Sequence, residues 1–164
     1  MLQRQPDLLA RVPKDLVFRA ANTKRKDAIS LAIDLGFDPN WYDDCAALHA
    51  VVGDADLVRH LIARGASATL RDPWYDGTVV GWAEFFHHRE IRDMLLNEAP
   101  ICLFDALDYD RLDRVPDILA RDPGALHRPF AKCLTREPKP EDWVTPLERA
   151  QAAGKDAAVQ LLRK

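Results

Sequence analysis

Residues 76–96 read DGTVVGWAEFFHHREIRDMLL and contain two amphipathic patterns separated by a short turn. Thr78 opens the first pattern, and the second pattern begins after the pair His87-His88. Apolar side chains recur at helical spacing in both halves, at Val79, Val80, Ala83, Ile91, Met94, Leu95 and Leu96. The stretch therefore predicts two short helices joined by a tight turn.

A similar layout returns near the end of the chain, where residues 145–162 read TPLERAQAAGKDAAVQLL. Thr145 and Ala150 follow Thr78 and Ala83 at one and the same offset in the numbering. A third match has about half of this offset, because the triplet at residues 41–43 (WYD) recurs at 74–76. We infer an internal repeat of about 33 residues, each unit being a helix pair.

This pattern resembles the ankyrin repeat, in which T-P-L-H-x-A opens a first helix and a glycine after the second helix precedes an extended finger. The run Thr145-Pro146-Leu147 with Ala150 fits the first half, and residues 53–66 (GDADLVRHLIARGA) fit the second-helix half. In residues 76–96, Val79 and Gly81 replace the proline and the histidine of the pattern.

The resemblance implies an all-α fold, an ankyrin-type helix-turn-helix solenoid with short hairpin fingers. We expect a single domain over residues 1–164, with about five repeats at 15–43, 44–76, 77–100, 101–144 and 145–164, and a helical cap at residues 6–12. The repeat period places Cys45 at the threonine position of repeat two and Ala50 at the small helix-contact position, so the match of Leu48-His49 is interpreted as a coincidence. Pro116 is expected in the first turn of a helix that starts near Asp113.

Composition limits the classes of function. The chain has 164 residues, 48% of them hydrophobic, which is enough for the core of one domain. Its net charge of −3 and pI near 5.9 provide no basic field, so no nucleic-acid partner is expected. Short apolar runs and a charged N-terminal segment predict neither a membrane partner nor a secretory signal, and we expect a cytoplasmic protein with reduced thiols at Cys45, Cys102 and Cys133.

The resemblance also implies where a partner would bind, because finger tips and the exposed side of each first helix form a concave surface. Aromatic residues are frequent at these positions and provide large, rigid contact area. The candidate binding residues are Trp41, Tyr42, Trp74, Tyr75, Asp76, Phe85, Phe86, Tyr109 and Trp143. The function predicted from them is protein–protein interaction. The alternative is that these rings only pack one finger against the next.

Acidic residues are interleaved with the aromatic ones, at Asp43, Asp44, Asp76, Glu84, Asp108 and Asp110. An aromatic and negative face suits a cation, so the predicted partner is a basic peptide segment or an amine-bearing ligand held between residues 41–42 and 74–75. In this hypothesis Asp76 supplies charge. The alternative is that the carboxylates form a solvated rim.

The segment 124–144 is longer than a minimal finger. Long loops in compact domains are often functional, and this one is predicted to fold as a lid over a pocket containing Trp74, Phe85 and Tyr109. An enclosed pocket of this kind would bind a small molecule and would leave open a non-standard enzyme that uses Asp or Glu for acid–base chemistry.

Other catalytic patterns are weak. Cys45 and His49 are one helical turn apart on a predicted helix, so that a thiolate–imidazole contact is conceivable, although His49 could equally bond a neighbouring finger. The pair His87-His88 points in two directions and has no metal-ligand spacing around it, and no glycine-rich phosphate loop occurs. We therefore predict no catalytic residue, no metal and no cofactor.

Overall fold

The computed structural model describes residues 11–131 and 136–163. Within these ranges the regular structure is entirely helical, with no strand, so the predicted all-α class is confirmed. The α-helices are α2 (Leu16–Asn22), α3 (Lys26–Asp34), α4 (Ala47–Ala50), α5 (Ala55–Ala63), α6 (Val79–Phe85), α7 (Arg89–Glu98), α8 (Leu103–Asp108), α9 (Val115–Arg121), α10 (Pro146–Ala152) and α11 (Asp156–Leu162). Three 3₁₀ helices are η2 (Leu112–Arg114), η3 (Pro123–Leu126) and η4 (Pro140–Asp142).

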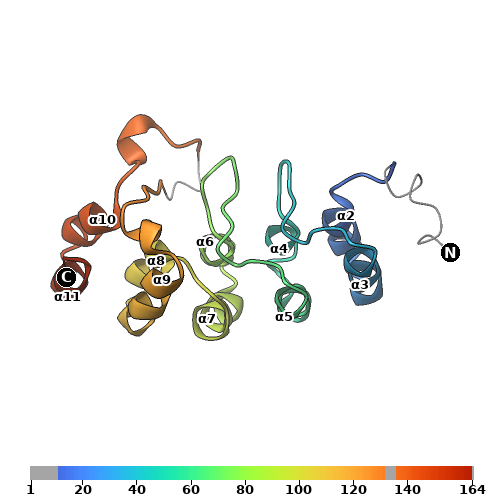
Figure 1. Ribbon diagram of the computed structural model, residues 1–164, viewed down its shortest axis with the longest axis horizontal. Helices are drawn as coiled ribbons and strands as arrows, with labels where there is room; N and C mark the ends of the chain where they lie inside the picture. Colours follow the sequence, from blue (N-terminus) through green and yellow to red (C-terminus); the bar gives the residue numbers. More distant parts are fainter. Residues whose placement is uncertain (1–10, 132–135, 164) are drawn as a thin grey trace.

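Consecutive helices form pairs that lie side by side along the long axis of the molecule (Figure 1). One row contains α2, α4, α6, α8 and α10, and the second row contains α3, α5, α7, α9 and α11. Three connections rise from the same side: the first finger (residues 37–45), the second finger (residues 66–77) and the described parts of the long loop (residues 124–131 and 136–144). Of the predicted cap at residues 6–12, all but 11 and 12 lie outside the described residues.

Side-chain caps explain where the first helices of the pairs begin. The Thr78 hydroxyl accepts a hydrogen bond from the Gly81 N–H at 3.2 Å and so caps α6. Thr145 forms a reciprocal capping box with Glu148 at the start of α10. The two threonines at matching positions of the sequence pattern therefore have the same role: each side chain accepts a hydrogen bond from an otherwise unpaired N–H group at the start of a helix.

One cluster of buried apolar side chains runs through all the helix pairs, from Val17 in α2 to Leu162 in α11. Each pair closes part of the core of its neighbour, because no single pair could bury its own apolar side. Pro116 is the second residue of α9, as predicted, although the helix starts at Val115 because the preceding residues form η2. No helix among the described residues has the length and apolar character that crossing a membrane requires.

The register predicted for repeat two is wrong by one residue. Ala46 is the residue before α4, so Cys45 lies outside the helix. Ala50 is exposed and Val51 is buried, which moves the helix-contact position by one residue as well. The reason is that the first finger has one residue more between its WYD triplet and the helix than the second finger has. The match of Leu48-His49 is therefore in register with the helix, and both side chains are buried.

The predicted hairpins are also not found. In the described part of the chain, strand-like pairing is limited to the isolated bridges Arg71–Thr78 and Phe130–Val144. Side chains hold the fingers instead: the Asn40 amide donates to the Gly65 carbonyl at 2.9 Å and accepts from the Ser67 N–H at 2.6 Å. Within the first finger the Asp38 carboxylate accepts from the Asn40 N–H at 2.8 Å, and local bonds of this kind compete with a strand ladder.

Candidate functional site

A hollow of about 560 Å³ opens where the two fingers and the long loop meet. We call it the aromatic hollow; its lining residues are Tyr42, Arg71, Asp72, Pro73, Trp74, Asp76, Glu137, Pro138 and Trp143. Trp74 is 50% exposed and Trp143 is 44% exposed, which is unusual for such large apolar side chains. The sequence separates these rings widely, and the side-by-side arrangement of the fingers and the loop brings them to one place.

Asp72 gives the second finger its shape. The residue is 3% exposed, and its carboxylate accepts four hydrogen bonds. One oxygen accepts from the Trp74 N–H at 3.0 Å and the Tyr75 N–H at 2.8 Å. The other oxygen accepts from the Gly77 N–H at 2.8 Å and from the Trp82 indole N–H at 2.9 Å. One buried carboxylate thus fixes the backbone that presents Trp74, a role that no sequence motif indicated.

Arg71 and Asp76 fix the long loop to the second finger. The Arg71 Nη1 donates to the Asp76 carboxylate at 3.0 Å and to the Pro129 carbonyl at 3.1 Å. The same carboxylate oxygen accepts from the Ala131 N–H at 3.1 Å. The guanidinium also lies 4.1 Å from the centre of the Phe130 ring, where cation–π attraction adds to the bond. The base of the loop is therefore anchored, and residues 137–143 form a wall of the aromatic hollow.

The acidic face predicted from the sequence is largely neutralised. Four of its six carboxylates are paired with basic side chains: Asp76 with Arg71, Glu84 with Arg92, Asp108 with Arg149 and Asp110 with Lys155. The Asp76 carboxyl is also half-buried, and burial raises its pKa although Arg71 and the Ala131 N–H oppose this. The charge that Asp76 was expected to offer a ligand is used inside the protein.

The structure brings together four of the nine predicted binding residues. Tyr42, Trp74, Asp76 and Trp143 line the aromatic hollow, whereas Trp41 and Tyr75 lie on the same fingers and do not line it. The other three lie at the ends of α6 and α8.

Phe85 and Phe86 contact each other edge to face at 5.1 Å. Tyr109 follows α8 and lies under the Arg92 guanidinium at 5.7 Å. Neither Phe85 nor Tyr109 lines the hollow beside the loop, so the predicted lid over these two rings is wrong.

Trp82 is the tryptophan that the sequence reasoning left out. Besides its bond to Asp72, its ring contacts His49 edge to face at 5.5 Å and Phe86 at 5.7 Å. It joins the second finger to the helix row below it. Trp82 follows Thr78 by one helical turn and precedes the buried Ala83, and this position in the sequence pattern already indicates a structural role.

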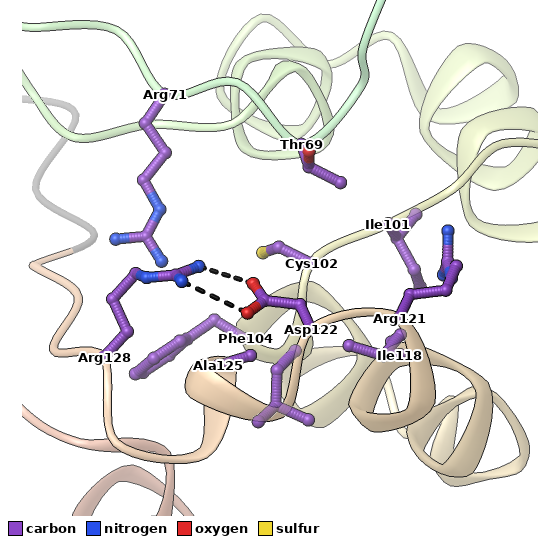
Figure 2. Close-up of a pocket in the computed structure, with 11 residues that line it drawn as sticks. Thr69, Arg71, Ile101, Cys102, Phe104, Ile118, Arg121, Asp122, Ala125 and Arg128 are labelled. Carbon is purple, nitrogen blue, oxygen red and sulfur yellow. Dashed lines mark hydrogen bonds and ion pairs between the residues drawn. The ribbon is translucent and has the colours of Figure 1, made fainter.

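A second pocket, of about 230 Å³, shares Arg71 with the aromatic hollow, and Figure 2 shows the side chains that line it. We call it the arginine pocket, because Arg71, Arg121 and Arg128 line it together with Asp122. Its remaining lining residues are Thr69, Ile101, Cys102, Leu103, Phe104, Ile118 and Ala125. The sequence scatters the arginines over residues 71–128 without a motif, so no local pattern could have identified this pocket.

The Cys45 thiol does not form the contact with the His49 imidazole that was considered from the sequence. Cys45 lies outside α4, and His49 bonds the Gly77 carbonyl through Nε2 at 3.1 Å instead. Burial raises the pKa of the Cys45 thiol to about 11 and raises that of Cys102 well above its ordinary value. Both thiols are therefore protonated near neutral pH, whereas a nucleophile would need the thiolate. Cys133 lies outside the described residues.

No group of three His, Cys, Asp or Glu side chains in residues 11–131 and 136–163 is arranged to hold a metal ion. The two other histidines considered from the sequence, His87 and His88, lie at the turn between α6 and α7, and the His88 ring packs on Gly53.

Comparisons with known proteins give no further guide. No protein-family model matches the chain, and a search of curated proteins finds no match. The function is therefore argued from the aromatic hollow and the arginine pocket themselves.

Proposed function

We propose that this chain is an interaction module of the ankyrin-repeat type, which binds a peptide segment of a partner protein in the aromatic hollow. One observation carries the proposal: three segments distant in sequence place Tyr42, Trp74 and Trp143 around one hollow, with both tryptophans about half exposed. Exposed aromatic side chains grouped in a concavity are typical of binding sites. The cytoplasmic location expected from the sequence stays a prediction.

The two tryptophans offer enough surface to contribute substantially to binding. A Trp side chain buries about 150–250 Å² when fully covered, so covering the exposed halves of Trp74 and Trp143 removes roughly that area from water. At about 25 cal/mol per Å² this is worth roughly 4–6 kcal/mol before the costs of association. Aromatic contact is therefore the main proposed source of affinity.

Charge provides a weaker preference for a basic segment. Glu137 lines the hollow and forms no ion pair among the described residues, in contrast to Asp76. A Lys or Arg side chain of the peptide that stacks on Trp143 would pair with Glu137. Because this pair would be exposed, we expect basic peptides to be favoured by only a few-fold.

The test is a selection of peptides from a random library, followed by calorimetry on variants. We expect selected peptides to bind Trp74→Ala and Trp143→Ala at least tenfold more weakly than wild type. Phe85→Ala is the matched control, because Phe85 is 44% exposed, like Trp143, but lies outside the hollow. Equal losses in Phe85→Ala and Trp74→Ala, or no peptide that depends on the tryptophans, would overturn the proposal.

A second candidate is a small-molecule site in the same hollow, because its volume of about 560 Å³ lies in the range of ligand pockets, roughly 300–1,000 Å³. An enzymatic version would use the Asp76 carboxyl, whose raised pKa is a feature of acid–base groups. Native mass spectrometry of the purified protein distinguishes the candidates. A co-purified compound that is absent from Trp74→Ala would favour the small molecule over the peptide.

A further inference from the structure

The arginine pocket differs in charge from the protein around it. The chain as a whole has a net charge of −3, whereas this pocket has three arginines and one aspartate in its lining. Arg128 is paired with Asp122 through two bonds of 2.7 and 3.2 Å, drawn as dashed lines in Figure 2. Arg71 is paired with Asp76, which lies outside the lining, whereas Arg121 forms no ion pair among the described residues.

Donor groups of these two arginines are not used by the protein. Arg71 bonds Asp76 and Pro129 through Nη1 alone, and its Nε and Nη2 have no hydrogen-bond partner among the described residues. Arg121 is exposed. Among the described residues its only hydrogen-bond partner is the Asp117 carbonyl, which accepts from Nε. Guanidinium groups with free N–H donors bind planar or tetrahedral oxyanions through pairs of parallel bonds.

The rest of the lining suits a small anionic group attached to an apolar one. In Figure 2 the Arg71 and Arg128 side chains converge at one end of the pocket and Arg121 lies at the other, with Cys102 and the Asp122 carboxylate between them; the other lining side chains are mainly apolar. The Cys102 thiol is neutral, because its pKa is raised by burial and by Asp105, so it does not repel an anion. At about 230 Å³ the pocket is smaller than a typical ligand site and holds one functional group of a larger ligand.

We infer that the arginine pocket binds a phosphate monoester, and that in the cell this is a phosphorylated side chain of the peptide held in the aromatic hollow. A phosphate monoester carries a charge near −2 at neutral pH and three acceptor oxygens, which suit the N–H donors that Arg71 and Arg121 leave unused. Arg71 lines both the pocket and the hollow, so the two sites adjoin. The claim that a peptide carries the phosphate rests on the proposed function. The claim that the arginine pocket binds a phosphate monoester does not.

The pocket is tested with phenyl phosphate, inorganic phosphate and benzoate, each titrated into isotope-labelled protein and followed through backbone amide NMR shifts. We expect phenyl phosphate to shift amides of residues 101–104 and 121–128 and to bind more tightly than either other probe. Inorganic phosphate lacks the apolar group, and benzoate has half the charge. Shifts only elsewhere, or benzoate binding as tightly as phenyl phosphate, would overturn the inference.

Two variants with opposite expected effects make the test specific. Arg121→Gln removes an exposed cation of the lining and should weaken phenyl phosphate binding by a few-fold, as expected for an exposed ion pair. Asp122→Asn removes the only carboxylate of the lining and releases Arg128, so it should strengthen binding several-fold. Arg89→Gln, at an exposed arginine in α7, is the matched control and should change nothing. Unchanged affinity in Arg121→Gln, or weaker binding in Asp122→Asn, contradicts the inference.

Trp74→Ala separates this inference from the proposed function. Trp74 lines the aromatic hollow and not the arginine pocket, so this variant should bind phenyl phosphate as wild type does while losing peptide binding. If library peptides fail to bind but phenyl phosphate binds as expected, the proposed function is wrong and the phosphate site stands. If phosphorylation of a bound serine in a selected peptide does not raise its affinity, the peptide is not the carrier.

Discussion

The two fingers contain the same WYD triplet, yet they present it differently. In the second finger Trp74 is half exposed and lines the aromatic hollow, whereas in the first finger Trp41 is more buried and does not line it. When the two triplets are aligned, Pro39 falls where the second finger has Asp72. The first finger therefore lacks the buried carboxylate that accepts four hydrogen bonds in the second finger. A repeated sequence motif does not by itself produce the same loop structure.

The helices that follow the fingers show a related difference. Thr78 caps α6 and also donates to the Asp105 carboxylate in α8 at 2.9 Å, whereas Ala46 precedes α4 without a side-chain cap. The link between α4 and the next pair is made instead by His49, which bonds the Gly77 carbonyl. Each of these two units is thus tied to the next one by a buried polar bond, but the residue that makes it differs.

The largest expected effect comes from removing the carboxylate that distinguishes the second finger. Asp72→Ala leaves the Gly77 N–H and the Trp82 indole N–H without a partner in a buried place, along with two further N–H groups of the finger. Since each unsatisfied buried donor costs about 1–3 kcal/mol, we expect the free energy of unfolding to fall by roughly 3–5 kcal/mol. Urea unfolding followed by tryptophan fluorescence measures it.

Asp38→Ala is the matched control in the first finger. The Asp38 carboxylate is exposed and accepts one bond, from the Asn40 N–H at 2.8 Å, so its loss should cost no more than about 1 kcal/mol. Equal losses in the two variants would mean that the buried carboxylate does not set the second finger apart.

The next effect is a pH dependence that comes from His49. Its Nε2 must carry the hydrogen, because its partner is a carbonyl, and its buried Nδ1 has no hydrogen-bond partner in the part of the chain that the structure describes. Burial lowers the pKa of His49 from 6.5, although the Gly77 bond and Asp72 act to raise it. Below pH 6.5 the unfolded chain takes up a proton that the folded protein resists, so stability present above that pH is lost as the pH falls toward the lowered pKa.

We therefore expect the free energy of unfolding to fall as the pH drops from 7 to 5, by about 1.4 kcal/mol for each pH unit between 6.5 and the lowered pKa of His49, and the unfolding midpoint in urea to fall with it. His49→Gln keeps a donor for the Gly77 carbonyl and removes the titration, so its midpoint should change less over the same range. A wild-type midpoint that is constant over this range, or that changes as much as that of His49→Gln, would contradict the account.

These differences show what could be predicted from the sequence. The helix pairs follow from the spacing of apolar side chains and from caps such as Thr78 and Thr145, which act within a few residues. The predicted register of α4 was wrong because a fixed repeat period takes no account of one extra residue in a finger. The aromatic hollow was predicted in part, since its tryptophans stand in loops. The role of Asp72 comes from four contacts within residues 72–82 that follow no recognised motif, whereas that of Arg71 depends on contact with the distant Pro129, which no local pattern records.

A smaller effect is expected where one finger is tied to the other. Asn40 bonds Ser67 in the second finger and Gly65 just before it, and the corresponding residue of the second finger, Pro73, can make neither bond with its side chain. Asn40→Ala should lower the free energy of unfolding by about 1–2 kcal/mol. Asn22→Ala is a control, because the exposed Asn22 bonds only the Phe18 carbonyl of its own helix at 3.1 Å. If both variants lose the same stability, the bonds between the fingers contribute little.

The smallest expected effect on stability belongs to the residue proposed to matter most for binding. Because Trp74 is 50% exposed, Trp74→Ala should change the free energy of unfolding by less than about 1 kcal/mol, well below the roughly 3–5 kcal/mol typical of a buried aromatic side chain. Trp41→Ala, at the more buried tryptophan of the matching triplet, should cost more stability and affect peptide binding less. Denaturant unfolding and calorimetry on the same two proteins measure both quantities. If Trp41 proved to be the binding residue and Trp74 the stabilising one, the assignment of the two fingers would be reversed.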